Sequence, residues 1–357
     1  MPRTRADSEA VASPKAQPEL MGPRRIGLLG VPSSAGARQI GQDSTPALFR
    51  RIGFLDLVGE LQLDVVDYGD LPRVSYRPDR ANRHSQNLPL VAAVARQVAD
   101  RVATIDDDGA FPLVIGGDCT ITLGVVAGLA RRTPTLGLMY FDGDVDLNTP
   151  ATTASGIFDG MGLAHIIGRG APELAGIGPA MPLVPQQRIV LFGFHDSWLD
   201  STETEALASS GIALFPRARL TGAAEVVAEE AACSLRERAE RYVVHFDVDV
   251  VDHLELPVAD VPHFGGVSLD DAETSLRIFL GGPGASALVL TEFNALQDPD
   301  GVASLGLARR VARCLSAART TDLADARRSG RQRQGGQGLG AVRSCLDRQM
   351  RIGLEPM

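Results

Sequence analysis

Five aspartates in two groups carry the chemistry that stands out in this sequence. They are Asp142, Asp144 and Asp146 in the first group, and Asp247 and Asp249 in the second. Within each group a carboxylate recurs on every second residue, so an extended chain would turn the members of a group to one face. Carboxylates held this close repel one another unless a cation lies between them. The spacing therefore indicates binding of divalent metal ions.

Each group follows a run of residues that predicts a buried strand. The first group follows residues 136–141, and the second follows residues 242–246. In open parallel sheets, ligands and metals bind at the edge formed by the carboxyl ends of the strands. With Asp252 as a further candidate, the acidic groups that would meet at that edge imply two cations rather than one.

Two other interpretations compete for the first group. Asp142 to Asp146 could be an acidic loop in water, and alternating aspartates also occur in calcium-binding loops. An EF-hand is disfavoured because its Gly-x5-Glu continuation is missing and a predicted strand, not a helix, precedes the group. The second acidic group, at the end of another predicted strand, favours a metal centre over the solvated loop.

The composition is that of a soluble globular protein. Of the 357 residues, 44% are hydrophobic and 22% are charged, which permits a large buried core. The net charge of −9 argues against a nucleic-acid-binding surface. No apolar run reaches the length of about 18 residues that a membrane span needs, and no signal segment is visible, so we expect a cytoplasmic protein.

Strands and helices are predicted to alternate along the chain. The predicted strands are 25–31, 63–66, 112–115, 136–141, 188–192, 242–246 and 287–291. The predicted helices are 44–51, 88–105, 121–131, 204–209, 223–240, 270–280 and 307–318. This alternation predicts an α/β fold: a single-domain, doubly wound, mostly parallel sheet with helices on both faces. The domain would span 25–318, between a disordered leader at 1–24 and a low-complexity basic tail at 319–357.

The strand-end motifs resemble those of the ureohydrolases, the family of arginase and agmatinase, over residues 25–318. The matching pieces, in chain order, are Gly116-Gly117-Asp118-Cys119, Asp142-Gly143-Asp144-Val145-Asp146, Asp247-Val248-Asp249 with Asp252, and Glu292. Family members are dimanganese enzymes that hydrolyse guanidino C–N bonds on an arginase-like α/β/α fold. The resemblance, which is closest to arginase, therefore implies two Mn²⁺ per chain.

The resemblance also implies which residues bind metal and substrate. The implied metal ligands are Cys119, Asp142, Asp144, Asp146, Asp247 and Asp249. Asn148, Thr153 and Ser155 look like the arginase loop that holds the α-carboxylate of the substrate. Asp196 would hold the α-ammonium. Because relatives form trimers or hexamers, we also expect a homo-oligomer.

Three positions at which the family has histidine hold other residues. Cys119 and Asp144 stand in place of the two histidine ligands, and Asp159 stands in place of a histidine thought to shuttle protons. In the head-group loop, Ile157 replaces an asparagine. The sequence assigns a site role to none of the six histidines of the chain.

These replacements change the charge expected at the metal centre. Five carboxylates, and a thiolate if Cys119 ionises, would face the two cations, so the ligand set is more negative than the family's. The cations could be held with weaker activation of bound water, or one site could be lost. Oxygen ligands favour Mn²⁺ or Mg²⁺ and a thiolate favours Zn²⁺ or Fe²⁺, although a buried Cys119 could also be an inert thiol.

The expected activity is hydrolysis of the guanidino C–N bond of an arginine-like amino acid. Nω-Hydroxy-L-arginine, giving hydroxyurea and ornithine, is favoured because an N-hydroxylated guanidine is less basic than the guanidinium of L-arginine. The Cys and Asp replacements are also similar to those of family members that act on Nω-hydroxyarginine. L-Arginine, giving urea and ornithine, is the other candidate substrate.

By the resemblance, three carboxylates would take part in the reaction. Asp146 would orient the attacking water, Glu292 would pair with the guanidinium, and Asp159 would pass protons to the leaving amine. Two alternatives stay open. The chain could be an agmatinase or guanidino-acid hydrolase, or it could be a catalytically degenerate member that acts as a binding or assembly subunit.

Overall fold

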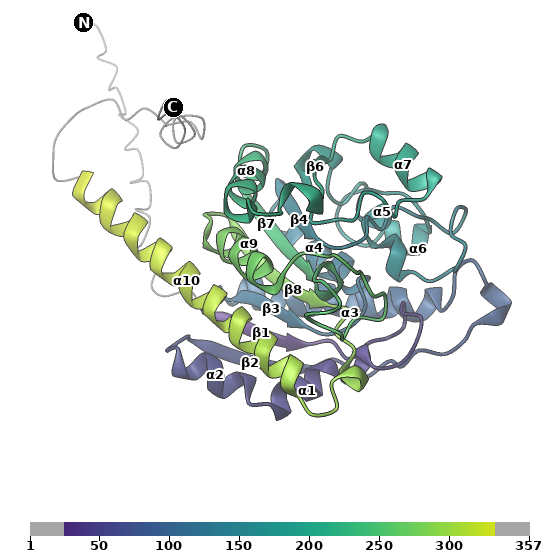
Figure 1. Ribbon diagram of the computed structural model, residues 1–357, viewed down its shortest axis with the longest axis horizontal. Coiled ribbons are helices and arrows are strands. Elements are labelled where there is room, and N and C mark those ends of the chain that lie inside the picture. The colour runs from purple at the N-terminus through teal and green to yellow at the C-terminus, as the bar shows by residue number, and fades with distance from the viewer. Residues whose placement is uncertain (1–24, 333–357) are drawn as a thin grey trace, which may run out of the picture.

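The centre of the molecule is one parallel sheet of eight strands (Figure 1). The strands are β1 (Ile26–Gly30), β2 (Val65–Asp70), β3 (Phe111–Ile115), β4 (Leu136–Phe141), β5 (Ile189–Phe192), β6 (Ala213–Phe215), β7 (Arg241–Asp247) and β8 (Ala285–Thr291). Their order across the sheet is β2-β1-β3-β8-β7-β4-β5-β6, and the neighbouring pairs are all parallel. The predicted doubly wound α/β fold is therefore confirmed.

This computed structural model describes the backbone of residues 25–332 and the side chains of residues 25–317. The predicted leader, 1–24, lies outside the described residues, as does the part of the predicted tail at 333–357.

Apolar strands in the middle of the sheet are buried on both faces. Every residue of β3, β4 and β8 is buried. Successive side chains of a strand point to opposite faces, so a fully apolar strand needs a layer of helices on each side. This requirement explains why the strands read as continuous apolar runs in the sequence.

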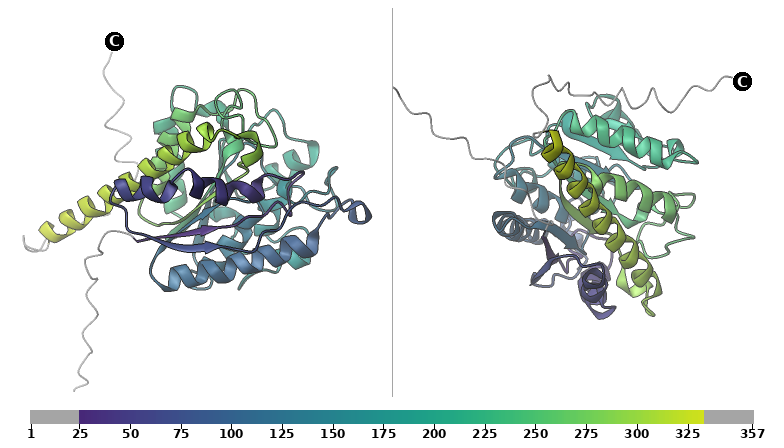
Figure 2. Two further views of the ribbon diagram at one scale, coloured as in Figure 1. Left: turned by 90° about the horizontal axis from the view of Figure 1, so that it is seen from below. Right: turned by 90° about the vertical axis from the view of Figure 1, so that its left-hand side faces the viewer.

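Ten α-helices in the described residues supply those two layers. They are α1 (Thr45–Arg51), α2 (Phe54–Glu60), α3 (Leu88–Asp107), α4 (Ile121–Ala130), α5 (Gly162–Ile166), α6 (Pro172–Ala175), α7 (Ser201–Ala208), α8 (Ala224–Arg236), α9 (Leu269–Gly281) and α10 (Val302–Gln332). Helices α3 to α7 pack on one face of the sheet, and α1, α2, α8, α9 and α10 pack on the other (Figures 1 and 2). None of the described helices is long and apolar enough to span a membrane.

Helix α10 continues past its predicted end at residue 318. It runs to Gln332 and so enters the range that the sequence analysis assigned to the tail. Alanine, leucine and arginine are strong helix formers, and no proline interrupts the segment. Where the domain gives way to the tail stays a prediction.

Candidate metal centre and substrate pocket

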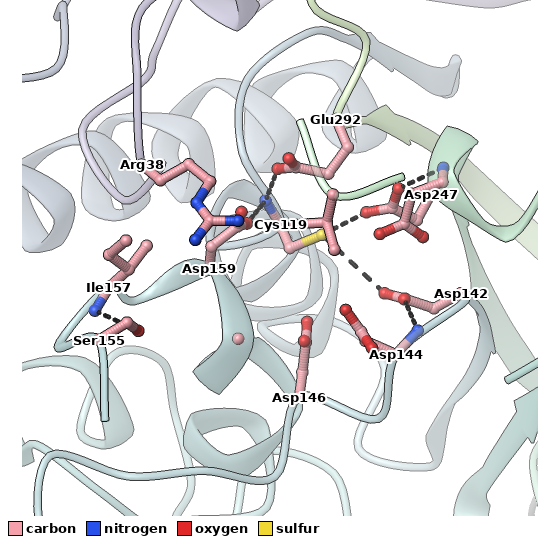
Figure 3. Close-up of a pocket in the computed structure, with 13 residues that line it drawn as sticks. Arg38, Cys119, Asp142, Asp144, Asp146, Ser155, Ile157, Asp159, Asp247 and Glu292 are labelled. Atoms are coloured by element: carbon pink, nitrogen blue, oxygen red, sulfur yellow. Dashed lines mark hydrogen bonds between the residues drawn. The ribbon is translucent and has the colours of Figure 1, made fainter. Parts of the chain in front are cut away.

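Four neighbouring strands end at one pocket. Across the order β3-β8-β7-β4, the residues at or just beyond their carboxyl ends include Cys119, Glu292, Asp247 and Asp142. The pocket is a cavity of about 170 Å³ (Figure 3). It is lined by Arg38, Cys119, Asp142, Asp144, Asp146, Ser155, Ile157, Asp159, Gly160, Asp247, Asp249, Val261 and Glu292. All of the predicted metal ligands and catalytic residues are therefore brought together at one place.

Cys119 lies within the first group of candidate ligands. Its Sγ is 2.6 Å from Oδ2 of Asp247, 3.9 Å from Oδ2 of Asp142 and 3.8 Å from Nε2 of His245. Nε2 of His245 is in turn 3.1 Å from Oδ2 of Asp142. All four side chains are buried. One sulfur, one nitrogen and two carboxylates thus converge within the reach of a single cation.

A second group of candidate ligands adjoins the first. Nε2 of His263 lies 3.4 Å from Oδ2 of Asp144 and 3.5 Å from Oδ2 of Asp249. The backbone N–H of Gly143 donates a hydrogen bond to Oδ1 of Asp249 at 3.1 Å, which ties the loop after β4 to the loop after β7. The two acidic groups seen in the sequence therefore form one continuous centre.

Local hydrogen bonds fix the first carboxylate of each acidic group. The backbone N–H of Asp144 donates to Oδ1 of Asp142 at 2.7 Å, and that of Asp249 donates to Oδ1 of Asp247 at 2.8 Å. In both cases an Asp side chain accepts from the backbone two residues further on, a contact that short polar side chains readily make. Each Asp-x-Asp segment thus orients its own leading side chain.

Two of the predicted catalytic residues have left-handed backbone conformations. Asp146 has φ of 49° and Glu292 has φ of 61°, values that residues with a Cβ rarely adopt. The Tyr140 hydroxyl donates to Oδ2 of Asp146 at 2.5 Å. Glu292 accepts from the backbone N–H of Cys119 at 3.2 Å and from the side chain of Gln42. Such strain concentrates at functional sites, where the surrounding structure holds it in place.

Burial and mutual repulsion raise the pKa values of the carboxyl groups. For Asp142 burial is the largest cause, followed by the charges of Asp146 and Asp247. The pKa of Asp247 is raised by burial and then by Asp249, and the pKa of the Cys119 thiol is raised by burial and then by Asp247. These groups become stable in their charged forms when cations lie among them. The donor set therefore fits the pair of divalent metal ions that the family resemblance implies.

Asp159 reaches the same cluster from the loop before α5. Its Oδ1 accepts a hydrogen bond of 3.0 Å from the backbone N–H of Cys119. Burial, followed by the nearby charge of Asp118, raises the pKa of Asp159 to about 7. A carboxyl group with a pKa near neutrality can both give and take a proton at that pH.

Of the four predicted head-group residues, Ser155 lines the cavity. Oγ1 of Thr153 lies 3.2 Å from Oγ of Ser155, inside the loop, and Nδ2 of Asn148 donates to Oδ2 of Asp200 at 3.1 Å. Asp196 is exposed and lies outside the lining. Asp200, the N-cap of α7, and Glu203 in the first turn of that helix are therefore acids that contact Asn148 of the head-group loop.

Three residues near the centre were missed from the sequence. His245 precedes Asp247 by two residues on β7, so the period of a strand already placed both on one face. His263 lies in the loop between β7 and α9, and Arg38 lies in the loop after β1. Neither loop position has a periodicity that could have revealed it.

Comparison with known proteins agrees with this geometry. A parallel α/β sheet with an acid-rich centre at the carboxyl ends of its strands is an architecture suited to a metal-dependent enzyme. Residues 24–317 match the Arginase family model. The chain belongs to the arginase family, a family of dinuclear-metal hydrolases that act on amidine C–N bonds. The predicted family and enzyme class are thus confirmed.

Relatives match over most of their own length. The arginase of Bacillus caldovelox is 29% identical over 277 residues, which are 76% of this chain and 92% of the relative. Arginase-1 of Homo sapiens is 31% identical over 251 residues, or 69% of this chain and 77% of the relative. The crystal structure of arginase from Bacillus cereus superposes with a TM-score of 0.74 and 28% identity, covering 83% of this chain and 98% of that one.

Proposed function

We propose that this protein hydrolyses the guanidino C–N bond of an arginine-like amino acid. The favoured substrate is Nω-hydroxy-L-arginine, which gives hydroxyurea and ornithine; L-arginine, which gives urea and ornithine, is the second. The observation that carries the proposal is the convergence of all the predicted ligands, with Asp159 and Glu292, on one cavity of about 170 Å³. A flat, cationic guanidinium group complements walls made of carboxylates.

The residues of the chain would divide the work of the reaction. Two divalent cations, Mn²⁺ by the family resemblance, supply an activated water when bound. Asp146, held by Tyr140, orients the attacking water through a hydrogen bond. Glu292 pairs with the guanidinium, and Asp159 donates a proton to the departing amine nitrogen.

The charge of the ligand set supports the hydroxylated substrate. Relative to a site with imidazole at positions 119 and 144, Asp144 adds one negative charge, and an ionised Cys119 adds another. A more anionic set lowers the pKa of bound water less, so the nucleophile at neutral pH is weaker. An N-hydroxyguanidine is less basic than a guanidinium and presents a carbon that is more readily attacked.

The open side of the cavity supports a substrate with an amino-acid head group. Arg38 is exposed and is the one basic residue among the described residues that line the cavity (Figure 3). Its guanidinium and the hydroxyl of Ser155 can bind a carboxylate. The carboxylate of Asp200, beside Asn148, can accept a hydrogen bond from an α-ammonium group. Agmatine has no carboxylate, so these groups favour an amino acid over agmatine.

Metal content and a substrate panel test the proposal together. The protein, reconstituted with Mn²⁺, is assayed with L-arginine, Nω-hydroxy-L-arginine, agmatine and a guanidino acid for release of urea, hydroxyurea and the amine product. We expect two metal equivalents per chain and the highest kcat/KM with Nω-hydroxy-L-arginine. Turnover of agmatine alone would support an agmatinase, and no bound metal would support a degenerate binding subunit.

We also propose a cytoplasmic homo-oligomer, a trimer or hexamer, which sedimentation analysis can test.

A further inference from the structure

Two buried histidines face the acidic centre, although the motif positions at which the family has histidine hold Cys119 and Asp144. The histidines are His245 on β7 and His263 in the loop before α9. Both are at most 1% exposed. Each lies against a different one of the two substituted residues, His245 beside Cys119 and His263 beside Asp144.

The spacing of the side chains around His245 fits that of ligands around one metal ion. In a tetrahedral zinc site, neighbouring nitrogen and oxygen ligands lie about 3.3 Å apart, and sulfur lies about 3.6 Å from either. Nε2 of His245 is 3.1 Å from Oδ2 of Asp142 and 3.8 Å from Sγ of Cys119, within a few tenths of an ångström of those values. The 2.6 Å contact between Cys119 and Asp247 is shorter and must lengthen on metal binding.

The other ring nitrogen of His245 already has a partner that would orient the ring. Nδ1 lies 2.8 Å from Oγ1 of Thr122, and the ring stacks on Tyr140 with centroids 4.1 Å apart. In the tautomer with Nδ1–H donating to the hydroxyl, the lone pair of Nε2 faces the carboxylates and the thiol; in the other tautomer Nε2–H donates to Oδ2 of Asp142. Metal-binding histidines characteristically make such a contact through the nitrogen that does not bind the metal.

His263 is the second candidate for a metal-binding histidine, for a different reason. Nδ1 is buried and makes no hydrogen bond within the described part of the chain, whereas Nε2 forms ion pairs with Asp144 and Asp249. Leaving buried polar atoms without partners is costly. Nε2 is directed at Asp144 and Asp249, 3.4 and 3.5 Å away, close to the ligand spacing of about 3.3 Å. A cation among these three groups could bind Nε2 and one oxygen of each carboxylate.

We propose that His245 and His263 each bind one of the two metal ions, returning the imidazole ligands that positions 119 and 144 have lost. This inference rests on the proposed function only in assuming a dinuclear centre. The first site then combines Cys119, His245, Asp142 and Asp247, and the second combines His263, Asp144 and Asp249. Only the first site contains a sulfur ligand, so the two sites differ in the metal ion that they prefer. The first equivalent of Zn²⁺ therefore goes to the site that contains Cys119.

Metal-binding measurements on phenylalanine variants test the assignment. His245→Phe keeps the stack on Tyr140, and His263→Phe keeps the stack on Trp198, whose ring lies 4.6 Å away. The matched control is His195→Phe, since His195 stacks on the same Trp198 but lies outside the candidate ligand groups. Metal content and dissociation constants are measured for Co²⁺ and Mn²⁺, together with the thiolate-to-cobalt charge-transfer absorption of the Co²⁺-loaded protein.

We expect two equivalents in the wild type and in His195→Phe. His245→Phe should weaken the site that gives the charge-transfer band by at least about tenfold, and His263→Phe should weaken the other by a similar factor. If both folded variants keep two metals with unchanged affinities and the same absorption, the assignment is wrong.

Crystals of the wild-type protein give a test that does not depend on the folding of any variant. Anomalous maps are collected with one equivalent of Zn²⁺ and excess Mn²⁺. The proposal expects zinc beside Cys119 and His245, and manganese beside His263; metals seated out of reach of both rings would overturn it. A protein that binds metals through both histidines but cleaves no guanidine would refute the proposed function and leave this assignment standing.

Discussion

Protonation of His165 should make the stability of the domain depend on pH. This side chain, on α5, is 2% exposed. Nδ1 lies 2.7 Å from the carbonyl oxygen of Met161, and Nε2 accepts the backbone N–H of Ala171 at 3.1 Å. Both contacts are satisfied by the neutral imidazole, whereas a proton on Nε2 would oppose the N–H of Ala171. Burial lowers the pKa of His165 from 6.5 to about 4.

The sign and the size of the effect follow from that shift. Between pH 6.5 and about 4 the unfolded chain binds a proton at His165 and the folded chain does not. The stability due to the neutral ring is thus fully present above pH 6.5 and is lost as the pH falls toward about 4. The whole effect amounts to about 3 kcal/mol, and about 2 kcal/mol of it should be gone by about pH 5.

Urea unfolding at pH 7.5 and 5 of the wild type, His165→Gln and His84→Gln measures this contribution. A chelator is present throughout, so that release of metal does not add to the difference. His84 is exposed and serves as the matched control. The loss of unfolding free energy between the two pH values should be smaller in His165→Gln by about 2 kcal/mol, and unchanged in His84→Gln. Equal losses in all three proteins would refute the reasoning about the buried ring.

Three further predictions concern the metal centre and the head-group loop. Asp247→Ala should abolish turnover and reduce bound metal, as measured by kinetics and metal analysis; surviving activity would show that the ligand assignment is wrong. Changing Cys119 and Asp144 together to His should raise kcat/KM for L-arginine relative to Nω-hydroxy-L-arginine, and an unchanged ratio with metals bound would contradict the charge argument. Gly156→Ala should lower the unfolding free energy by about 2 kcal/mol or more, because φ there is +70° and the new Cβ would lie 1.9 Å from the carbonyl oxygen of Arg83; thermal unfolding checks this.

The sheet and its acidic edge could be predicted because their signals are local. An apolar run followed by Asp142 or Asp247 marks a buried strand and what lies at its end, and parallel pairing then brings such ends to one edge. By contrast, β6 is only Ala213–Phe215 at the edge of the sheet, and two of its three residues are not buried. The apolar run that contains it, residues 212–215, is short and lies between Gly211 and Pro216, so the sequence analysis did not assign it to a strand.

The site residues that the sequence did not indicate were missed for different reasons. His245 shares the two-residue period of Asp247, but it does not lie at a position where the family has histidine. His263 reaches the centre only because the loop after β7 folds back, where the backbone N–H of His253 bonds to its carbonyl oxygen at 2.9 Å. Asp200 contacts Asn148 through the placement of α7. Contacts made by long loops depend on tertiary structure, and spacing along the chain does not encode them.

At Asp146 and Glu292 the left-handed backbone makes the demands of folding stability and of the proposed reaction conflict. Glycine would relax either turn at no steric cost, yet it would delete a carboxylate to which the proposed reaction gives a role. Random variation screened for heat resistance should therefore enrich glycine at these two positions while yielding inert protein. If natural variants keep Asp or Glu at these two positions, that would indicate that selection acts on enzymatic activity and not on stability alone.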